Sequence, residues 1–146
     1  MIEILLPLLR ADEGTRLVVY DDATGKPIVP GSKVIGHPTI GTGRCLDTNG
    51  ITQEEADYLL ANDIAKVSAA LDKRIPWWRS LTPNRQAVLA SMAFQMGVDG
   101  LMAFVGTLAA VQAGNYSVAA ERMLVSLWSR QTPARAGRLS AMMRSG

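Results

Sequence analysis

Carboxylates gather in two adjacent pairs within the first 22 residues of the chain. Asp12 and Glu13 form the first pair, and Asp21 and Asp22 follow next to Tyr20. Two carboxyl groups can divide acid and base work, because a protonated one donates to a leaving oxygen while an ionised one handles water or a developing cation. Glycoside hydrolysis needs these two parts. The same residue types also cluster in solvated turns, so spacing alone leaves both interpretations open.

The chain holds one cysteine, Cys45, and one histidine, His37. An intramolecular disulfide is therefore excluded, and soft ligands are too few for an ordinary zinc site, which excludes zinc amidases and zinc proteases. We expect no metal and no cofactor. A thiol nucleophile with a histidine base would make a cysteine peptidase or amidase, but no motif supplies a third, orienting group. A small buried cysteine is the favoured interpretation.

Length and composition fit one domain over 1–146, with 48% hydrophobic and 19% charged residues. The longest apolar stretches, 87–96 and 101–113, are shorter than the roughly 20 residues of a membrane-spanning helix. No basic region or cleavage site follows the first apolar run, so we expect no signal peptide. Charge is uneven: residues 1–72 hold six Lys/Arg and eleven Asp/Glu, and residues 73–146 hold nine and two. A basic second half suits an anionic polymer, although solvated faces give the same asymmetry.

Apolar spacing and turn residues predict the elements of the first half. Residues 1–11 have a short helical pattern. Over 17–46, glycines and prolines separate β-branched stretches, which predicts a small antiparallel sheet with loops. Thr52 and Glu55 form a capping box that opens a helix over about 53–75.

The second half is predicted to be helical. Thr82 and Thr132 each precede a proline, which is typical of an N-cap followed by the first helical position. Residues 87–96 are apolar on nearly every face, which predicts a helix buried on all sides and ended by Gly97. Further helices are expected at about 100–113, 116–129 and 133–144.

Together these elements predict an α+β fold that is mainly α. A small β-sheet lobe over about 12–52 is followed by a linking helix over about 53–75 and a helical lobe over about 76–146. We expect a cleft between the lobes, the usual place for a ligand.

Seven blocks of sequence connect these predictions to a known family. They are Asp12-Glu13-Gly14, Tyr20-Asp21-Asp22, the segment 38–44, the segment 51–56, Asn62-Asp63, Phe94-Gln95-Met96-Gly97 and the segment 128–136. In this order they resemble the phage-type lysozyme family, the endolysins. The resemblance covers almost the whole chain and implies a lysozyme-like fold in which the N-terminal helix joins the helical lobe.

The resemblance implies an endolysin that hydrolyses the β-1,4 bond between N-acetylmuramic acid and N-acetylglucosamine in bacterial peptidoglycan and so causes host cell lysis. It matches the catalytic residues of the family to Glu13, Asp22 and Thr39. Glu13 would protonate the glycosidic oxygen, which requires a raised pKa. Asp22 would stay ionised and would either stabilise the oxocarbenium-like state or, with Thr39, position water on the opposite face of the sugar, the inverting arrangement.

The segment between the second and third catalytic residues departs from the family pattern. Sixteen residues separate Asp22 from Thr39, more than in the compact pattern. This insertion either extends the substrate contact or forms a longer surface loop. It also leaves Asp21 as a competitor for the second carboxylate and Thr42 as a competitor for the threonine.

The resemblance also implies substrate-binding residues in the helical lobe: Phe94, Gln95, Gln131, Thr132 and Arg135. Arg135 would orient Glu13 while lowering its pKa. Thr132 is also explained as the N-cap of the last helix. Arg44 stands where the family usually has His, which predicts an ion pair with Asp63 that persists above neutral pH.

Two alternative functions remain. A lytic transglycosylase uses one catalytic acid and forms an anhydro product, and the presence of Asp22 and Thr39 argues against it. A non-enzymatic cationic protein would disrupt the outer membrane through its basic C-terminal stretch, which holds Arg130, Arg135, Arg138 and Arg144.

The partners expected from this interpretation are few. Peptidoglycan is the substrate, and the basic C-terminal helices would bind anionic outer-membrane lipopolysaccharide in a salt-sensitive way. We expect a monomer and no nucleic acid partner. By family resemblance, the protein is made in the host cytoplasm, needs a holin for export and acts on the cell wall in the periplasm.

Overall fold

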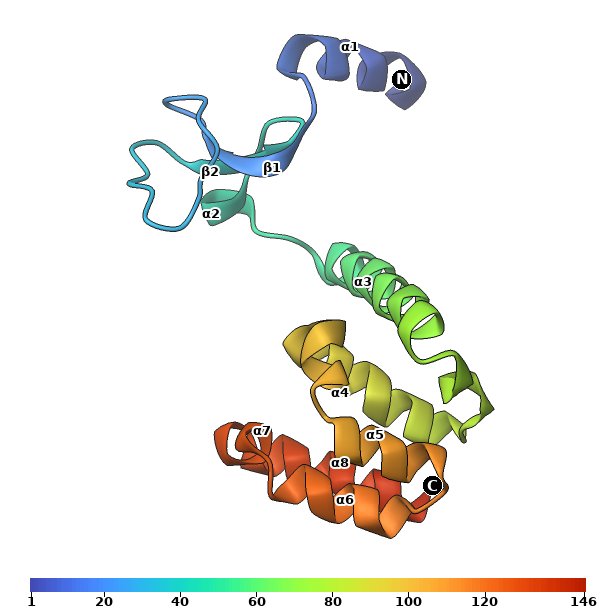
Figure 1. Ribbon diagram of the computed structural model, residues 1–146. Helices are drawn as coiled ribbons and strands as arrows, with labels where there is room; N and C mark the ends of the chain where they lie inside the picture. The colour runs from blue at the N-terminus through green and yellow to red at the C-terminus, as the bar shows by residue number, and fades with distance from the viewer. The chain divides into compact units, whose positions relative to one another are not determined.

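Three short strands and two helices make up the first part of the computed structural model, which describes all residues 1–146 as two units, 1–57 and 58–146 (Figure 1). The elements of the first unit are α1 (Ile2–Glu13), β1 (Arg16–Asp21), β2 (Pro38–Gly41), β3 (Arg44–Cys45) and α2 (Leu46–Asn49). The antiparallel sheet has the order β1-β2-β3, so β2 is central. Thr39 on β2 faces Tyr20 on one side and Cys45 on the other.

Helix α1 is longer than the predicted 1–11 and ends at Glu13. Gly14 follows with φ 69°, a left-handed conformation that favours glycine, and its N–H donates to the carbonyl of Arg10. The helix therefore delivers Glu13 to the point where the chain turns into β1. Pro7 lies inside the helix.

Helix α3 (Gln53–Arg74) confirms the helix predicted over 53–75. The predicted capping box is present: Thr52 Oγ1 accepts from the N–H of Glu55 at 3.2 Å, and Glu55 Oε2 accepts from the N–H of Thr52 at 2.7 Å. These two bonds satisfy donors that have no partner inside the helix, which explains why the helix begins here.

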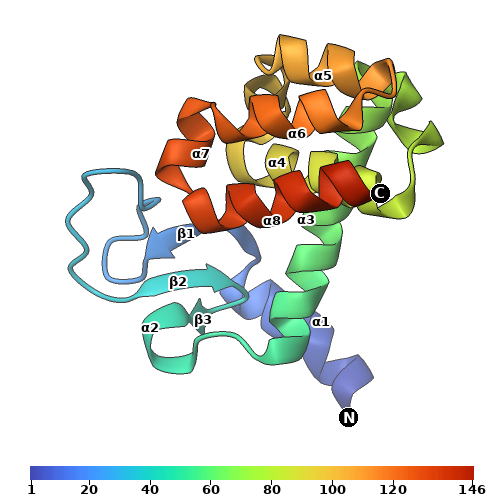
Figure 2. The ribbon, with the colours of Figure 1, turned by 90° about the horizontal axis from the view of Figure 1, so that it is seen from below.

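The second unit is helical throughout. After α3 it contains the 3-10 helix η1 (Pro76–Ser80), α4 (Pro83–Met102), α5 (Val105–Gln112), α6 (Tyr116–Leu124), α7 (Leu127–Gln131) and α8 (Pro133–Ser145). Figure 2 shows α6 beside α5 and α8, and α8 also packs on α4. The small sheet and the many helices confirm the mainly α, α+β fold.

Two predicted helix boundaries are wrong. The helix predicted over 100–113 is the end of α4 and a separate α5, with Ala103 and Phe104 between them. The helix predicted over 116–129 is divided into α6 and α7 because the Ser126 side chain caps α7, accepting from the N–H of Ser129 at 3.1 Å.

The two threonines predicted as N-caps, Thr82 and Thr132, make different hydrogen bonds. Thr82 Oγ1 accepts from the N–H of Arg85 at 3.4 Å, as an N-cap should. Thr132 stands at the N-cap position of α8, but its hydroxyl donates to the carbonyl of Trp128 at 3.0 Å and makes no cap bond. Its position was predicted correctly and its capping bond was not.

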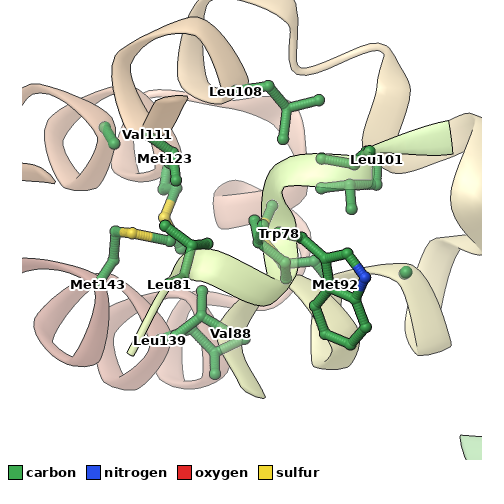
Figure 3. Close-up of a cluster of buried hydrophobic side chains, with 14 of the residues drawn as sticks. Trp78, Leu81, Val88, Met92, Leu101, Leu108, Val111, Met123, Leu139 and Met143 are labelled. Carbon is green, nitrogen blue, oxygen red and sulfur yellow. The ribbon is translucent and has the colours of Figure 1, made fainter. Parts of the chain in front are cut away.

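The core lies within the helices of the second unit. Trp78, Val88, Met92, Met123 and Met143 are among its buried side chains (Figure 3). The helix over 87–96 supplies much of this core and ends its regular turn at Gly97, whose φ of 77° and ψ of 159° are non-helical.

The prediction that 87–96 is buried on all sides is wrong. Phe94 is 47% exposed, and Ala87 and Gln95 are exposed as well. This face lines a groove of about 360 Å³ with apolar side chains of α3. Its apolar character therefore belongs partly to a surface hollow.

No single helix meets the length and hydropathy needed to span a membrane, and only α4 with α5, bent by 102°, meets them as a pair.

Candidate active site

Asp21 and Asp22 are neighbours in sequence but occupy different environments. Asp21 is 3% exposed, and its carboxylate accepts three backbone N–H bonds, from Ile35 at 2.8 Å and from Ala23 and Gly36 at 3.0 Å. These bonds, that from Ile35 most of all, hold the pKa of Asp21 below its usual range. The Asp21 carboxylate is fully used in closing the loop between β1 and β2, which leaves Asp22 as the accessible carboxylate.

Asp22 is exposed and is held by the backbone of one residue. Its Oδ1 accepts from the N–H of His37 at 2.7 Å, and its own N–H donates to the carbonyl of His37 at 3.1 Å. The carbonyl of His37 also accepts from Thr39 Oγ1 at 3.2 Å. The predicted residues Asp22 and Thr39 are therefore brought together on one carbonyl, across the sixteen residues that separate them.

The competing threonine lies elsewhere. Thr42 is exposed in the turn between β2 and β3, where its Oγ1 is 3.2 Å from Thr15 Oγ1. Thr39 is 4% exposed and central in the sheet. The geometry favours Thr39 over Thr42 as the threonine beside Asp22.

Gly36 permits the close approach of the loop to Asp22. A Cβ placed on Gly36 would overlap Asp22 Oδ1 and lie 2.8 Å from the backbone nitrogen of Ala23. Only a residue without a side chain fits there. In the sequence Gly36 gives only a turn signal, so its role in placing Asp22 was not predicted.

Glu13 lies exposed at the end of α1, against the turn between β2 and β3. A Cβ on Gly43 in that turn would be 3.4 Å from Glu13 Oε2. Within the first unit, Glu13 thus lies beside the turn that follows β2, the strand that carries Thr39. Glu13 has no hydrogen-bond partner that would prevent it from donating to a ligand.

Three of the five predicted substrate-binding residues line two hollows of the second unit. Phe94 and Arg135 line the groove of about 360 Å³, and Gln131 lines a hollow of about 400 Å³ with Phe104 and Trp128.

Trp128 forms hydrogen bonds with the other two predicted substrate-binding residues, Gln95 and Thr132. Its Nε1–H donates to Gln95 Oε1 at 2.9 Å, and its carbonyl accepts from Thr132. The ring of Phe104 packs edge-on at 6.1 Å. Trp128 itself is buried, with 7% of its surface exposed. Its part in holding Gln95 was not predicted, since hydrogen bonds between residues 33 apart leave no local signal.

A family model described as phage lysozyme matches residues 10–144. The chain belongs to the phage lysozyme family. This membership supports a lysozyme-type, peptidoglycan-degrading hydrolase.

The relatives of this chain differ in the share of their own length that the chain covers. The "Pre-baseplate central spike protein Gp5" of Enterobacteria phage T4 is 33% identical over 95% of this chain, which spans only 27% of that protein. The "Probable T4-type lysozyme 1" of Dictyostelium discoideum is 24% identical over 100% of this chain and 96% of its own length. The "Endolysin" of Acyrthosiphon pisum secondary endosymbiont phage 1 is 30% identical over 86% of this chain and 77% of its own length.

One predicted contact of this phage lysozyme is wrong. Arg44 does not pair with Asp63: its Nη1 is 2.8 Å from Glu55 Oε1, and its Nε donates to the carbonyl of Gly50 at 2.8 Å. Asp63 lies 3.3 Å from Lys66 instead. The capping box holds Glu55 within reach of Arg44, and the Thr52 N–H, followed by the charge of Arg44, keeps the pKa of Glu55 below its usual range. The sequence already pointed to Glu55 as a fixed carboxylate, because the capping box predicted its position at the start of the helix.

Cys45, favoured from the sequence as a small buried residue, is only half-buried, and Asp47 lies between it and His37. Asp47 Oδ1 accepts from Cys45 Sγ at 2.8 Å, and Asp47 Oδ2 is 2.8 Å from His37 Nδ1. The hydrogen bond and charge of Asp47 raise the pKa of His37. Because the thiol donates to the carboxylate and not to the imidazole, the arrangement does not present His37 as a base for Cys45.

Proposed function

We propose that the chain is a muramidase that hydrolyses the β-1,4 bond between N-acetylmuramic acid and N-acetylglucosamine in peptidoglycan. The observation that carries this proposal is the joint anchoring of Asp22 and Thr39 on the carbonyl of His37. The shared backbone anchor supports a joint role for the Asp22 carboxylate and the Thr39 hydroxyl in orienting one water molecule. Glu13, exposed at the end of α1, supplies the separate proton donor that glycoside hydrolysis requires.

The proposed roles follow from hydrogen bonding. Glu13 in its protonated form donates to the glycosidic oxygen as the bond to the anomeric carbon breaks. The Asp22 carboxylate accepts a proton from the attacking water, with Oδ1 fixed by the His37 N–H. Because the Thr39 hydroxyl donates to a carbonyl, its lone pairs are free to accept from the same water. Attack by water on the face opposite to the leaving group gives inversion, and that is the outcome we propose.

The second unit would bind the glycan. We propose Phe94, Gln95, Gln131, Thr132 and Arg135 as substrate-binding residues, with Gln95 held by Trp128 and able to donate its amide N–H to acetamido or hydroxyl groups. Arg135, exposed at the rim of its groove, would contact polar groups of the glycan. Residues 1–146 would form one catalytic domain.

The proposed biological setting is host cell lysis. The chain would be made in the host cytoplasm, pass the inner membrane with a holin and act in the periplasm as a monomer. The basic C-terminal helices would add salt-sensitive binding to lipopolysaccharide. Similarity to a phage spike protein favours a second setting, in which the same chemistry is carried in the phage particle. Mass spectrometry of purified particles separates these settings, since only the second places the chain there.

The decisive experiment digests purified Gram-negative peptidoglycan and identifies the muropeptides by mass spectrometry. Wild type should release reducing muramic acid ends, and Glu13→Gln and Asp22→Asn should release none while keeping the wild-type melting temperature. Asp12→Asn is the matched control, because it removes the carboxylate adjacent to Glu13 and should leave the digestion unchanged. NMR of the first-formed anomer reads the stereochemistry.

The other outcomes are equally definite. Anhydro ends would make the chain a lytic transglycosylase. Lysis of cells that persists in Glu13→Gln, without sugar cleavage, would identify a cationic membrane-disrupting protein.

A further inference from the structure

Three metal-ligating side chains converge on the opposite end of the sheet from Glu13. They are His37, Cys45 and Asp47, and their ligand atoms all lie within 4.8 Å of one another. Asp47 is the centre of the group, with one carboxylate oxygen 2.8 Å from His37 Nδ1 and the other 2.8 Å from Cys45 Sγ. None of the three side chains takes part in the proposed hydrolysis.

The backbone sets the positions of these three residues. Cys45 ends β3 and faces Thr39 across the ladder, and α2 begins immediately after it, so Asp47 lies in the first turn of a helix packed on β2. Figure 2 shows α2 beneath β2 and β3. His37 precedes β2 and is fixed by its two backbone bonds with Asp22. The ligands therefore come from three different segments whose spacing is determined by the sheet.

We propose that His37, Cys45 and Asp47 bind one divalent ion of the zinc class. One imidazole nitrogen, one thiolate and one carboxylate oxygen form a mixed N, S and O set, which suits Zn²⁺ and related ions, whereas Ca²⁺ and Mg²⁺ prefer oxygen ligands alone. With bonds of about 2.0–2.3 Å and tetrahedral angles, neighbouring ligand atoms stand roughly 3.5 Å apart. The 2.8 Å contact made by whichever Asp47 oxygen binds the metal would therefore widen by less than about 1 Å, and water would fill the fourth position.

Binding has a defined proton balance. The Cys45 thiol loses its proton to solvent, and His37 Nδ1 gives up any proton that it shares with Asp47, so both hydrogen bonds to the carboxylate are exchanged for bonds to the metal. The ion would then join the segment before β2 to the segment after β3. Because the backbone of His37 carries Asp22 and Thr39, the site would stiffen the support of both residues.

The sequence concealed this site. Counting one cysteine and one histidine indicates too few soft ligands, and Asp47 is not distinguished from the other acidic residues by any motif. Three protein ligands with an open position are nevertheless a complete set for a zinc ion that keeps a water molecule. The count from the sequence omitted one ligand, the carboxylate of Asp47, which the fold places beside His37 and Cys45.

Cobalt binding tests the proposal independently of muramidase activity. The untagged, reduced and metal-free chain is titrated with Co²⁺, whose thiolate complexes absorb in the near ultraviolet, and Zn²⁺ is then added. We expect a band that saturates at one ion per chain and disappears when Zn²⁺ displaces Co²⁺. Cys45→Ser should abolish the band, and His37→Asn and Asp47→Asn should each weaken binding at least about tenfold, since even outer-shell changes cost that much.

Controls separate loss of a ligand from loss of the fold. Glu54→Gln removes an exposed carboxylate of the same unit and should bind as wild type does. The melting temperature of wild type, but not of Cys45→Ser, should rise in Zn²⁺ relative to chelator, because a ligand bound only to the folded chain stabilises it. Absence of the band in wild type overturns the proposal. Equal affinity in wild type, His37→Asn and Asp47→Asn also overturns it, because the thiol alone would then hold the metal.

Discussion

Replacing Gly36 with alanine asks how closely the proposed chemistry depends on the position of Asp22. The added Cβ would overlap Asp22 Oδ1 and lie 2.7 Å from Ala23 Cβ and 2.8 Å from its nitrogen, and separations under 3.0 Å are essentially never seen for a real Cβ. The conformation of Gly36 is not left-handed, so the effect is steric and not one of backbone strain. The Asp22 carboxylate must therefore move and release the N–H of His37.

The expected magnitudes follow from this overlap. Overpacking costs about 1–3 kcal/mol of unfolding free energy, which for a chain of this size lowers the melting temperature by roughly 3–10 °C. Displacing a catalytic group by about 1 Å costs on the order of 100-fold in rate. The loss of activity at 25 °C should thus be much larger than the loss of folded protein, because a domain of ordinary stability remains folded after such a change.

The assay compares initial rates of muropeptide release with thermal unfolding followed by circular dichroism. Gly137→Ala is the matched control: a Cβ there meets no atom within 4 Å, and the helical position should gain about 0.4–1 kcal/mol with unchanged activity. If Gly36→Ala loses stability but hydrolyses peptidoglycan at the wild-type rate, the position of Asp22 does not limit the reaction and the proposed role is wrong.

Three further predictions concern stability. The ionised Asp21 carboxylate stabilises the fold at any pH above its ordinary pKa of 3.8, and this stabilisation is lost as the pH falls through its lowered pKa in the folded chain. The difference in melting temperature between wild type and Asp21→Asn should therefore be largest near neutral pH and disappear in acid. A difference that does not depend on pH would contradict this. Glu55→Gln should lower the melting temperature by removing the partner of Arg44, whereas Asp63→Asn should change it by less than about 2 °C in the same scan; the reverse order would restore the pair expected from family resemblance. Met92→Ala, at a position that is 0% exposed, should cost about 2–5 kcal/mol, seen as a lower urea midpoint with an unchanged slope.

Local signals carried most of the fold prediction. The capping box at Thr52 and the threonine and proline pairs at Thr82 and Thr132 set helix starts correctly, because helix ends depend on residues a few positions apart. The break at Ser126 was missed although a serine before Leu127 is a cap signal. Apolar content alone suggested one continuous helix there.

The candidate site was harder to read because long-range bonds decide it. Asp21 and Asp22 are chemically identical in sequence, and the donors that distinguish them stand 14 and 15 residues away. Periodicity also could not separate a core face from a groove face: it indicated burial for Phe94, and only the family resemblance placed this exposed residue among the substrate-binding side chains. What could be predicted was the type of residue and its order; which carboxylate is free depends on the folded loop.

The three hydrogen bonds to Asp21 fix the ends of the loop between β1 and β2, so additional residues can be inserted in this loop. Its base is tied by the N–H groups of Ile35 and Gly36, while Pro30 and Gly31 at the tip are exposed. Lengthening a flexible tip is cheap, since each doubling of a loop costs about 0.6 kcal/mol. A peptide inserted at the tip would therefore be displayed on the same loop as Asp22 without shifting its carboxylate, which makes this loop the natural position for retargeting the enzyme to another cell surface.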